Sequence, residues 1–298
     1  MNSLNGVVLV DKPSGMTSHD VVEDLRRILK IQAVGHAGTL DPLATGLLVC
    51  LVGEATKLSQ YVMNEEKSYR VGLRFGIRTD SGDITGKVMA ECDAGSIEIP
   101  DLKIKIDQLV GEISLLVPKY SAVKVGGRKL YEYARKNEDV EVPKKIMTIH
   151  RAQLLEYSQG QALIDIDCEK GTYVRSWVEK LGENLGVGAT VTSLRRLTSG
   201  AFKVEQSQTV SEISEKLNEG DGPLVPMEDV LGAWPALMVF NRDQTLLKNG
   251  QIPRGIFGQI SQIDVKHGIR LLDDQGQLLA LVVRDDEKGI KLARVFKN

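Results

Sequence analysis

An aspartate followed by a proline lies in a polar loop that precedes a strongly apolar segment. Asp41 and Pro42 lie in a loop rich in glycine and threonine, and residues 46–52 form a continuous apolar run. Such a run is typical of a strand buried on both faces. Because a carboxylate beside so much apolar surface needs a partner, Asp41 is a candidate catalytic residue. A turn-forming role, in which Asp41 binds local backbone amides, is the alternative.

A second candidate pair stands where a helix is expected to begin. If the backbone is extended there, the side chains of Tyr173 and Arg175 project to the same side. A cation in the first turn of a helix opposes the macrodipole, so Arg175 needs an anionic partner. We expect Asp41 to be that partner, with its pKa held below the reference value of about 3.9. An ordinary structural salt bridge explains Arg175 equally well.

Motifs for cofactors and metals are absent from the sequence. There is no phosphate-binding Gly-Lys-Ser/Thr loop, no dinucleotide fingerprint, no paired cysteine ligands and no His-Glu-x-x-His. The four histidines are too far apart in the sequence to suggest a metal site. We therefore predict a reaction that uses neither a metal nor a cofactor.

The elements that must position these residues alternate between strands and helices. Strands are predicted at 6–10, 69–75, 112–117 and 162–168, and helices after Thr17 or Ser18 and over 54–62 and 102–110. Another helix follows residue 171, and residues 77–86 form a polar loop. This order predicts the α+β class, with a mixed, largely antiparallel catalytic domain.

The pattern changes from about residue 234. Short apolar pieces at 236–240, 256–260, 278–283 and 290–296 are separated by glycine and aspartate turns. They indicate a small all-β module. We predict a catalytic domain over residues 1–232, with a basic insertion at about 118–151, and a second domain over residues 233–298.

Charge is distributed unevenly, although the formal net charge is only −2. Residues 118–151 contain nine Lys/Arg and four acidic residues, whereas residues 205–232 contain one Lys and seven acidic residues. Opposed patches of this kind can steer a polyanion to one face of the molecule. From the charge distribution alone, a solvated charged face without a binding role explains the pattern equally well. We predict that four basic residues contact phosphates: Lys119, Lys124, Arg128 and Lys129.

Composition limits the class of protein. A hydrophobic content of 42% and a charged content of 26% are typical of a soluble globular protein. Cys50, Cys92 and Cys168 do not have the spacing of metal ligands. We therefore expect all three cysteines to be small buried apolar residues of a protein in a reducing compartment. No apolar run reaches membrane-spanning length, and no signal peptide fits the N-terminal residues. A cytoplasmic protein is predicted.

Eight segments of the sequence form a recognisable set of motifs. The longest is His36-Ala-Gly-Thr-Leu-Asp41-Pro-Leu-Ala-Thr-Gly46, around the candidate carboxylate, and the others lie at 12–18, 67–70, 76–83, 120–124, 130–135, 170–175 and 194–200. In this order they closely resemble the motifs of the TruB family of tRNA pseudouridine synthases. A mild departure from the family pattern occurs at 117–119. The resemblance covers residues 6 to about 202, and the C-terminal module is similar, on weaker motifs, to a PUA-type RNA-binding domain.

The resemblance implies that a uridine at position 55 in the T-loop of tRNA is detached from its ribose, rotated and rejoined through carbon. Asp41 would be the essential carboxylate, and Tyr69 would stack on the flipped uracil. The remaining implied catalytic residues are Tyr173 and Arg175, and the implied substrate-binding residues are His36, Leu194, Asp83, Lys12 and Lys124. His36 would lie near the gap that the flipped base leaves, and Asp83 on the substrate loop.

General chemistry agrees with base flipping. A base leaves its stack at a cost of a few kcal/mol, and aromatic stacking of about 1–3 kcal/mol per base can offset that cost. Asp41 is then either a nucleophile or a proton abstractor. The expected partner is the T-arm of tRNA, bound by a monomer that needs no membrane, protein partner or guide RNA. A non-catalytic tRNA-binding or folding module and a nucleoside hydrolase are the alternatives.

Overall fold

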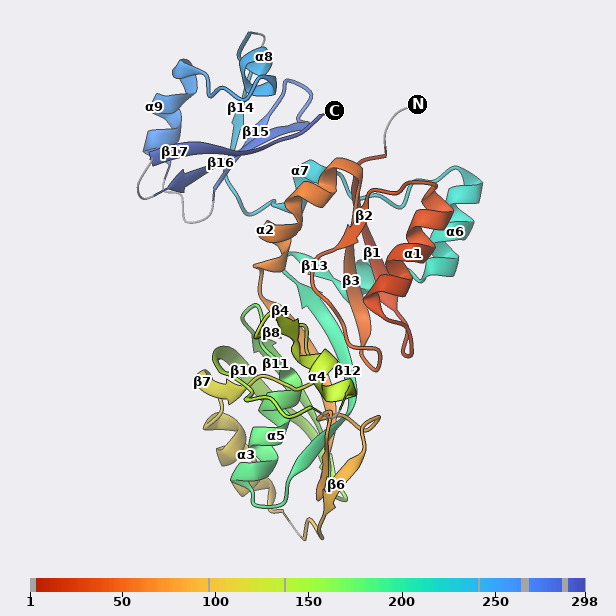
Figure 1. Ribbon diagram of the computed structural model, residues 1–298. Coiled ribbons are helices and arrows are strands. Elements are labelled where there is room, and N and C mark those ends of the chain that lie inside the picture. Colours follow the sequence, from red (N-terminus) through yellow and green to blue (C-terminus); the bar gives the residue numbers. More distant parts are fainter. Residues whose placement is uncertain are drawn as a thin grey trace.

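The computed structural model describes residues 4–95, 97–136, 138–240, 242–263, 268–285 and 289–297. Most of the chain is organised on one central sheet, and a smaller sheet near the C-terminus lies to one side of it (Figure 1). Across the central sheet the strands are β1 (Gly6–Lys12), β3 (Thr45–Val52), β12 (Ala189–Ser199), β4 (Lys67–Phe75), β11 (Gln161–Cys168), β10 (Lys144–Ser158) and β7 (Gly111–Leu116). β2 (Val34–His36) pairs with β3, and β13 (Phe202–Lys203) pairs with β12.

The central sheet is mixed and largely antiparallel, as the sequence predicts. Neighbouring strands run antiparallel except β3 and β12, which pair in parallel through Thr45 with Arg195 and Gly46 with Arg196. This parallel contact joins strands that lie far apart in the chain. It places the residues that precede β3 next to the second half of β12.

The apolar run of β3 is buried on both faces, which confirms the expectation from its sequence. Leu48, Cys50 and Val52 belong to one apolar cluster, and Leu47, Val49 and Leu51 belong to another. All six have no measurable exposure. β3 is therefore a rigid support for the loop that precedes it.

Helices flank the central sheet. They are α1 (Ser18–Leu29), α2 (Ser59–Met63), α3 (Ile99–Asp107), α4 (Leu130–Arg135), α5 (Val174–Asn184), α6 (Val210–Glu219) and α7 (Met227–Val230), with short 3₁₀ turns η1 (Gly53–Leu58) and η2 (Val204–Gln206). Two small hairpins, β5 (Ile77–Thr79) with β6 (Val88–Glu91) and β8 (Lys124–Val125) with β9 (Arg128–Lys129), complete this part.

Local interactions explain the start of α1 and the packing of α5. Thr17 caps α1 through a reciprocal capping box with Asp20, an arrangement that satisfies two free amide groups of the first turn. α5 packs through Trp177, which is fully buried and donates its indole N–H to the Leu109 carbonyl at 2.9 Å. The start of α5 is thereby tied to the turn between α3 and β7.

The C-terminal part contains a four-stranded sheet: β14 (Ala236–Met238), β15 (Ile269–Leu272), β16 (Leu278–Asp285) and β17 (Gly289–Val295). The prediction of an all-β module is wrong in one respect, because α8 (Arg242–Lys248) and α9 (Arg254–Gln262) accompany the sheet. Residues 256–260 were expected as an extended piece but lie in α9. Ile256 and Ile260 are four residues apart and both buried, which is helical spacing.

The C-terminal sheet packs against the rest of the protein. Leu281 and Phe296 share an apolar cluster with Leu58, and the rings of Tyr61 and Trp234 meet edge to face at 5.3 Å. Figure 1 shows this part above and beside α2. Such contacts fix the C-terminal sheet relative to β3 and the 3₁₀ turn that follows it.

The burial of the three cysteines and the length of the helices bear on two further predictions from the sequence. Cys50 and Cys168 are buried as expected, but Cys92 is exposed and donates its thiol to the Val187 carbonyl at 3.1 Å. The reason is its position beyond β6, at the periphery of the fold. Within the described ranges, no helix is long and apolar enough to cross a membrane.

Candidate active site

Asp41 lies on the loop between β2 and β3, and α1 holds this loop in place. The Ser18 hydroxyl accepts from the Leu40 amide at 2.8 Å and donates to the Leu40 carbonyl at 3.2 Å. The amide of Gly15 donates to the Pro42 carbonyl at 2.8 Å. The residues on either side of Asp41 are therefore both fixed.

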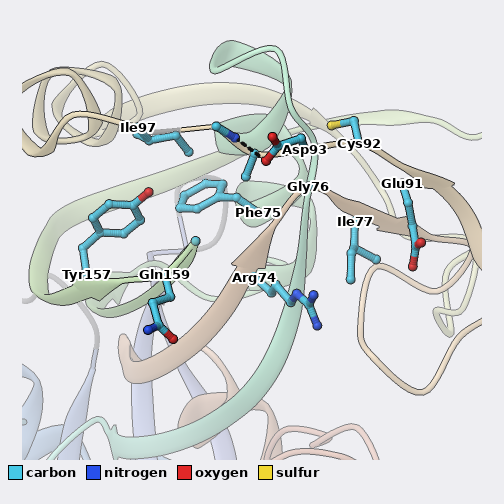
Figure 2. A pocket seen from close by; sticks show the side chains of 13 residues that line it. Arg74, Phe75, Gly76, Ile77, Glu91, Cys92, Asp93, Ile97, Tyr157 and Gln159 are labelled. Atoms are coloured by element: carbon cyan, nitrogen blue, oxygen red, sulfur yellow. Dashed lines mark hydrogen bonds between the residues drawn. The ribbon is translucent and has the colours of Figure 1, made fainter.

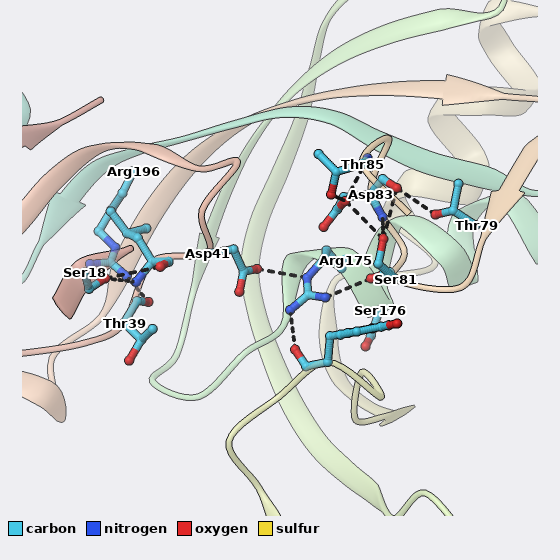
Figure 3. Close-up of polar contacts among 12 residues, drawn as sticks. Ser18, Thr39, Asp41, Thr79, Ser81, Asp83, Thr85, Arg175, Ser176 and Arg196 are labelled. Atoms are coloured by element: carbon cyan, nitrogen blue, oxygen red, sulfur yellow. Dashed lines mark hydrogen bonds and ion pairs between the residues drawn. The ribbon is translucent and has the colours of Figure 1, made fainter. Parts of the chain in front are cut away.

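Arg175 is the ion-pair partner of Asp41, as the sequence predicts. Its Nε lies 2.9 Å from Asp41 Oδ2. Its two terminal nitrogens donate to the Ser81 carbonyl at 2.8 Å and the Tyr120 carbonyl at 3.0 Å. Figure 3 shows Arg175 between Asp41 and the loop that carries Ser81. One buried guanidinium thus joins three separate segments around the carboxylate.

The sequence predicts a lowered pKa for the Asp41 carboxyl, and this prediction is wrong. Burial raises the pKa of Asp41 above its ordinary value of 3.8, and the charge of Asp83 raises it further. The guanidinium groups of Arg175 and Arg196 act in the opposite direction. Desolvation outweighs the ion pair here, because the carboxylate exchanges much of its hydration for a single direct partner.

A cavity of about 390 Å³ opens at this ion pair. Asp41, Asp83 and Arg175 line it together with residues of three loops and α4: Pro42, Asp80, Ser81, Thr85, Gly86, Lys87, Tyr120, Tyr131 and Arg135. Asp41 keeps 36% of its side chain exposed while Arg175 keeps only 6%. The carboxylate can thus be reached from the cavity while its partner stays buried.

Asp83 shapes the loop that faces Asp41. Its Oδ1 accepts from the Thr85 hydroxyl at 2.6 Å, the Thr85 amide at 3.0 Å and the Ser81 hydroxyl at 3.0 Å. These are bonds of an Asx turn, and Figure 3 shows them beside Arg175. Asp83 is buried and lines the cavity, so it also contributes negative charge near Asp41.

Tyr69 and Leu194 lie on adjacent strands of the central sheet. Tyr69 is on β4 opposite Arg196 of β12, and Leu194 is opposite Val71. Both Tyr69 and Leu194 are buried, at 8% exposure each. Burial raises the pKa of Tyr69, and the charge of Asp41 acts in the same direction. Neither side chain lines the cavity described above.

Tyr173 and His36 flank the site without lining this cavity. Tyr173 precedes α5, and burial raises its pKa, with Asp41 a further cause in the same direction. His36 ends β2, and burial and the charge of Arg196 lower its pKa. The Nδ1 atom of His36 is buried and has no hydrogen-bond partner among the described residues.

The two lysines predicted to bind substrate have opposite surroundings. Lys12 is fully buried, and its Nζ donates to the carbonyls of Pro13, Met16 and Pro42 at 2.8, 2.7 and 3.4 Å. Burial lowers its pKa to about 8. This geometry makes Lys12 a support of the Asp41 loop, with no surface for a direct contact. Lys124 is exposed on the β8–β9 hairpin, opposite Lys129.

Sequence reasoning missed Arg196 as a residue of the site. Its guanidinium is fully buried and contacts both the Asp41 loop and Tyr69. It also missed Tyr131 and Arg135 of α4, which line the cavity. The available signal was the presence of these residues in two of the recognised motifs, at 194–200 and 130–135.

A second cavity of about 510 Å³ lies away from the Asp41 loop, where β4 ends and the β10–β11 hairpin turns (Figure 2). Phe75, Gly76, Tyr157 and Gln159 are among its lining residues. Its charged side chains, Arg74, Glu91 and Asp93, are all exposed. None of the residues predicted for the active site lines it.

One group of side chains in the described part of the chain has the spacing of metal ligands. The ligand atoms of Glu66, His150 and Glu169 all lie within 4.8 Å of one another. Glu66 and His150 are exposed and Glu169 is half-buried, so water competes for each of them. The group does not include any residue of the Asp41 cavity.

Comparison with known proteins identifies the family of the chain. Residues 26–174 match the model of the TruB family pseudouridylate synthase N-terminal domain. Residues 175–231 match the tRNA pseudouridylate synthase B C-terminal domain. A tRNA pseudouridine synthase B of Bdellovibrio bacteriovorus is 44% identical over 99% of this chain and 98% of its own. The corresponding protein of Clostridium perfringens strain 13 is 36% identical over 98% and 99%.

Solved structures support the fold. A chain from an H/ACA ribonucleoprotein bound to a substrate RNA containing 2′-deoxyuridine superposes with a TM-score of 0.74 at 21% identity, covering 98% of this chain and 85% of that one. A chain from a Cbf5-Nop10-Gar1 complex gives 0.73 at 24% identity, covering 98% and 84%. The structural likeness establishes the architecture, and the sequence matches cover almost the whole chain. The chain belongs to the TruB family of pseudouridylate synthases, and it is therefore an isomerase.

Proposed function

We propose that this enzyme converts the uridine at position 55 in the T-loop of tRNA to pseudouridine, with Asp41 as the essential carboxylate. The observation that carries the proposal is the Asp41–Arg175 ion pair in the lining of the cavity. The names of the relatives, tRNA pseudouridine synthase B, support tRNA as the substrate. The position within tRNA rests on the resemblance of the motifs around Asp41.

The reaction is an isomerisation, so atoms balance without a co-reactant. The bond from N1 of uracil to C1′ of the ribose breaks, the base rotates, and a bond from C5 to C1′ forms. C5 loses a proton and N1 gains one. Asp41 acts either as a nucleophile on the sugar or as the base that removes a proton. In both cases Arg175 keeps the carboxylate oriented, because its Nε faces one carboxylate oxygen.

The uridine has to leave its stack to reach Asp41. Tyr69 is proposed to stack on the flipped uracil, and Tyr173 and Leu194 to complete the walls of the pocket. Aromatic stacking of about 1–3 kcal/mol per base offsets the energy of unstacking. His36, beside the Asp41 loop, is proposed to fill the space that the base vacates.

Affinity for the tRNA backbone is assigned to the basic segment. Lys124 and Lys129 lie directly opposite each other on the β8–β9 hairpin. Like charges in such a position repel unless an anion lies between them, which supports a contact with phosphate. The domain that we place at residues 233–298 is proposed to bind RNA as a PUA-like unit. We propose that the enzyme acts as a monomer without a guide RNA.

Purified protein and a T-arm transcript test the proposal directly. Incubation without cofactor, metal or other protein should yield pseudouridine at the predicted position. A non-catalytic tRNA-binding module would bind the transcript and leave the uridine unchanged. A nucleoside hydrolase would release free uracil. Uracil release, or an unchanged uridine with bound RNA, would contradict the proposed function.

A further inference from the structure

Arg196 is a buried cation held almost entirely by neutral groups. Only 2% of the residue is exposed. Nη1 donates to the carbonyls of Gly38 and Leu47, both at 3.2 Å, and Nη2 donates to the Thr39 carbonyl at 3.0 Å. Nε donates to the Tyr69 hydroxyl at 3.2 Å. These bonds use four of the five N–H groups of the guanidinium.

The neighbouring arginine has a conventional arrangement. Arg195 is 40% exposed in its side chain and forms two bonds to the carboxylate of Asp11, at 2.9 and 2.7 Å. Arg196, by contrast, has no carboxylate within ion-pair distance in the described part of the chain. Burying a charge without a counter-ion is unfavourable unless its hydrogen bonds are all well made. A neutral residue would avoid this cost, so the charge and its bonds need another explanation.

The acceptors of Arg196 belong to the two parts of the proposed site. Gly38 and Thr39 are on the loop that carries Asp41, and Leu47 is on β3 behind that loop. Tyr69 is on β4, and its ring centre lies 5.5 Å from the guanidinium carbon. Figure 3 shows Arg196 and Arg175 on opposite sides of Asp41. Arg175 holds the Asp41 carboxylate, and Arg196 holds the backbone of the same loop at Gly38 and Thr39.

We infer that Arg196 is a positioning residue that fixes the Asp41 loop relative to Tyr69. The inference rests on the proposed function, in which Asp41 reacts while Tyr69 stacks on the base. Because one planar group bonds both the loop carbonyls and the tyrosine, a shift of the loop would break bonds on both sides. A reacting group displaced by about 1 Å can slow a reaction about 100-fold.

The same contact orients the Tyr69 hydroxyl. Its oxygen already accepts from Arg196 Nε, so its own proton points away from Arg196. The hydroxyl is thereby available as a donor on the side of the ring away from the guanidinium. The charge of Arg196 also lowers the pKa of Asp41 and of Tyr69 against the effect of burial. Arg196 therefore assists the ionised form of Asp41 without touching its carboxylate.

Substitutions at two adjacent arginines test the inference. Arg196→Lys keeps the charge and most of the volume, but an ammonium cannot bond both loop carbonyls and the tyrosine in one plane. Arg196→Gln also removes the charge. Arg195→Gln is the matched control on the same strand. For each protein, single-turnover rate, tRNA dissociation constant, melting temperature and amide hydrogen exchange at residues 37–41 are measured.

We expect the single-turnover rate of Arg196→Lys to fall about 100-fold, with tRNA affinity within about threefold of the wild type, since phosphate contacts and stacking set affinity. Exchange at residues 37–41 should accelerate. In Arg196→Gln the acidic limb of the pH–rate profile should move to higher pH, because the Asp41 pKa rises without the nearby cation. Arg195→Gln should match the wild type in rate, pH profile and exchange.

Two outcomes overturn the inference. One is an Arg196→Lys protein with a rate and exchange pattern within twofold of the wild type. The other is an equal loss in Arg196→Lys and Arg195→Gln that follows melting temperature alone. A wild-type protein that makes no pseudouridine would contradict the proposed function instead, and the exchange data would still test the loop contact by themselves.

Discussion

Asp41 and Arg175 form an ion pair with Nε 2.9 Å from Oδ2, and yet the pKa of the Asp41 carboxyl is raised. Their surroundings therefore favour the protonated carboxyl more than water does. The ionised form, which either proposed mechanism requires, is kept at some expense of folding free energy. Sites that trade stability for function in this way are common in enzymes.

The first prediction is that Asp41→Asn abolishes turnover without destabilising the protein. A carboxamide keeps the shape and can still accept from Arg175 Nε, but it is neither a useful base nor a nucleophile. Since the raised pKa shows that the neutral form suits the site, the melting temperature at pH 7 should equal or exceed that of the wild type. Affinity for tRNA should stay within a few fold. Turnover, affinity and melting temperature are measured on one preparation.

The stability difference should also depend on pH. A carboxyl with a raised pKa in the folded state adds stability below its ordinary pKa of 3.8, and this stability is lost as pH rises through the raised value. The stability advantage of Asp41→Asn over the wild type should therefore shrink as pH falls.

Turnover decides the catalytic role of Asp41. A folded Asp41→Asn protein that still makes pseudouridine would refute the assignment of Asp41 as the essential carboxylate.

A second prediction concerns the pH dependence of turnover. Activity should fall as pH drops through the raised pKa of Asp41, so the acidic limb should lie above pH 3.8. Arg175→Leu removes a group that lowers this pKa and should move the limb to higher pH. Arg175→Lys retains the charge and should move it less. An acidic limb that is identical in all three proteins would show that the limb reports another group.

The third prediction is a change in salt dependence. Reversing both Lys124 and Lys129 should reduce the slope of log affinity against log salt by about 1.4–1.8, which is two contacts at about 0.7–0.9 each. Reversal of Lys103 and Lys105 on α3 is the control with the same charge change. An unchanged slope in the hairpin variant would mean that Lys124 and Lys129 form a solvated face.

The fourth prediction separates two roles of His36: filling the space that the flipped base leaves, and capping the local backbone as a structural residue. Its buried Nδ1 makes no hydrogen bond among the described residues, so His36→Ala removes no such bond at that atom. Base flipping should slow while the melting temperature stays nearly constant. His19→Ala, at a side chain that is 73% exposed, is the control. Normal flipping with a large loss of melting temperature would favour a capping role for His36.

The central elements of the fold could be predicted because their patterns are local. The apolar run of residues 46–52 predicts a doubly buried strand, and the alternation at 69–75 predicts β4. The parallel pairing of β3 with β12 could not be predicted, because it depends on which distant strands meet. In the C-terminal part, a five-residue apolar window was too short to distinguish α9 from a strand.

The candidate site was predictable in part for a similar reason. The charge of Arg175 in the first turn of a helix indicates an anionic partner, and the structure places it on Asp41. The direction in which the pKa of Asp41 shifts depends on how much water the fold removes from the carboxylate. This amount is set by tertiary packing and cannot be read from the sequence. Arg195 and Arg196 are equivalent in the sequence, and only the pleat of β12 decides which one enters the core.

The contacts of Arg196 have a consequence for folding during synthesis. It reaches Gly38, Thr39 and Leu47 across 158, 157 and 149 positions in the chain. β1 likewise depends on late residues, since Val7 exchanges backbone bonds with Val225. Contacts between such distant positions raise the contact order and delay closure of the sheet. A nascent chain carries Asp41 early, but the loop around it acquires its final shape only after β12 has left the ribosome.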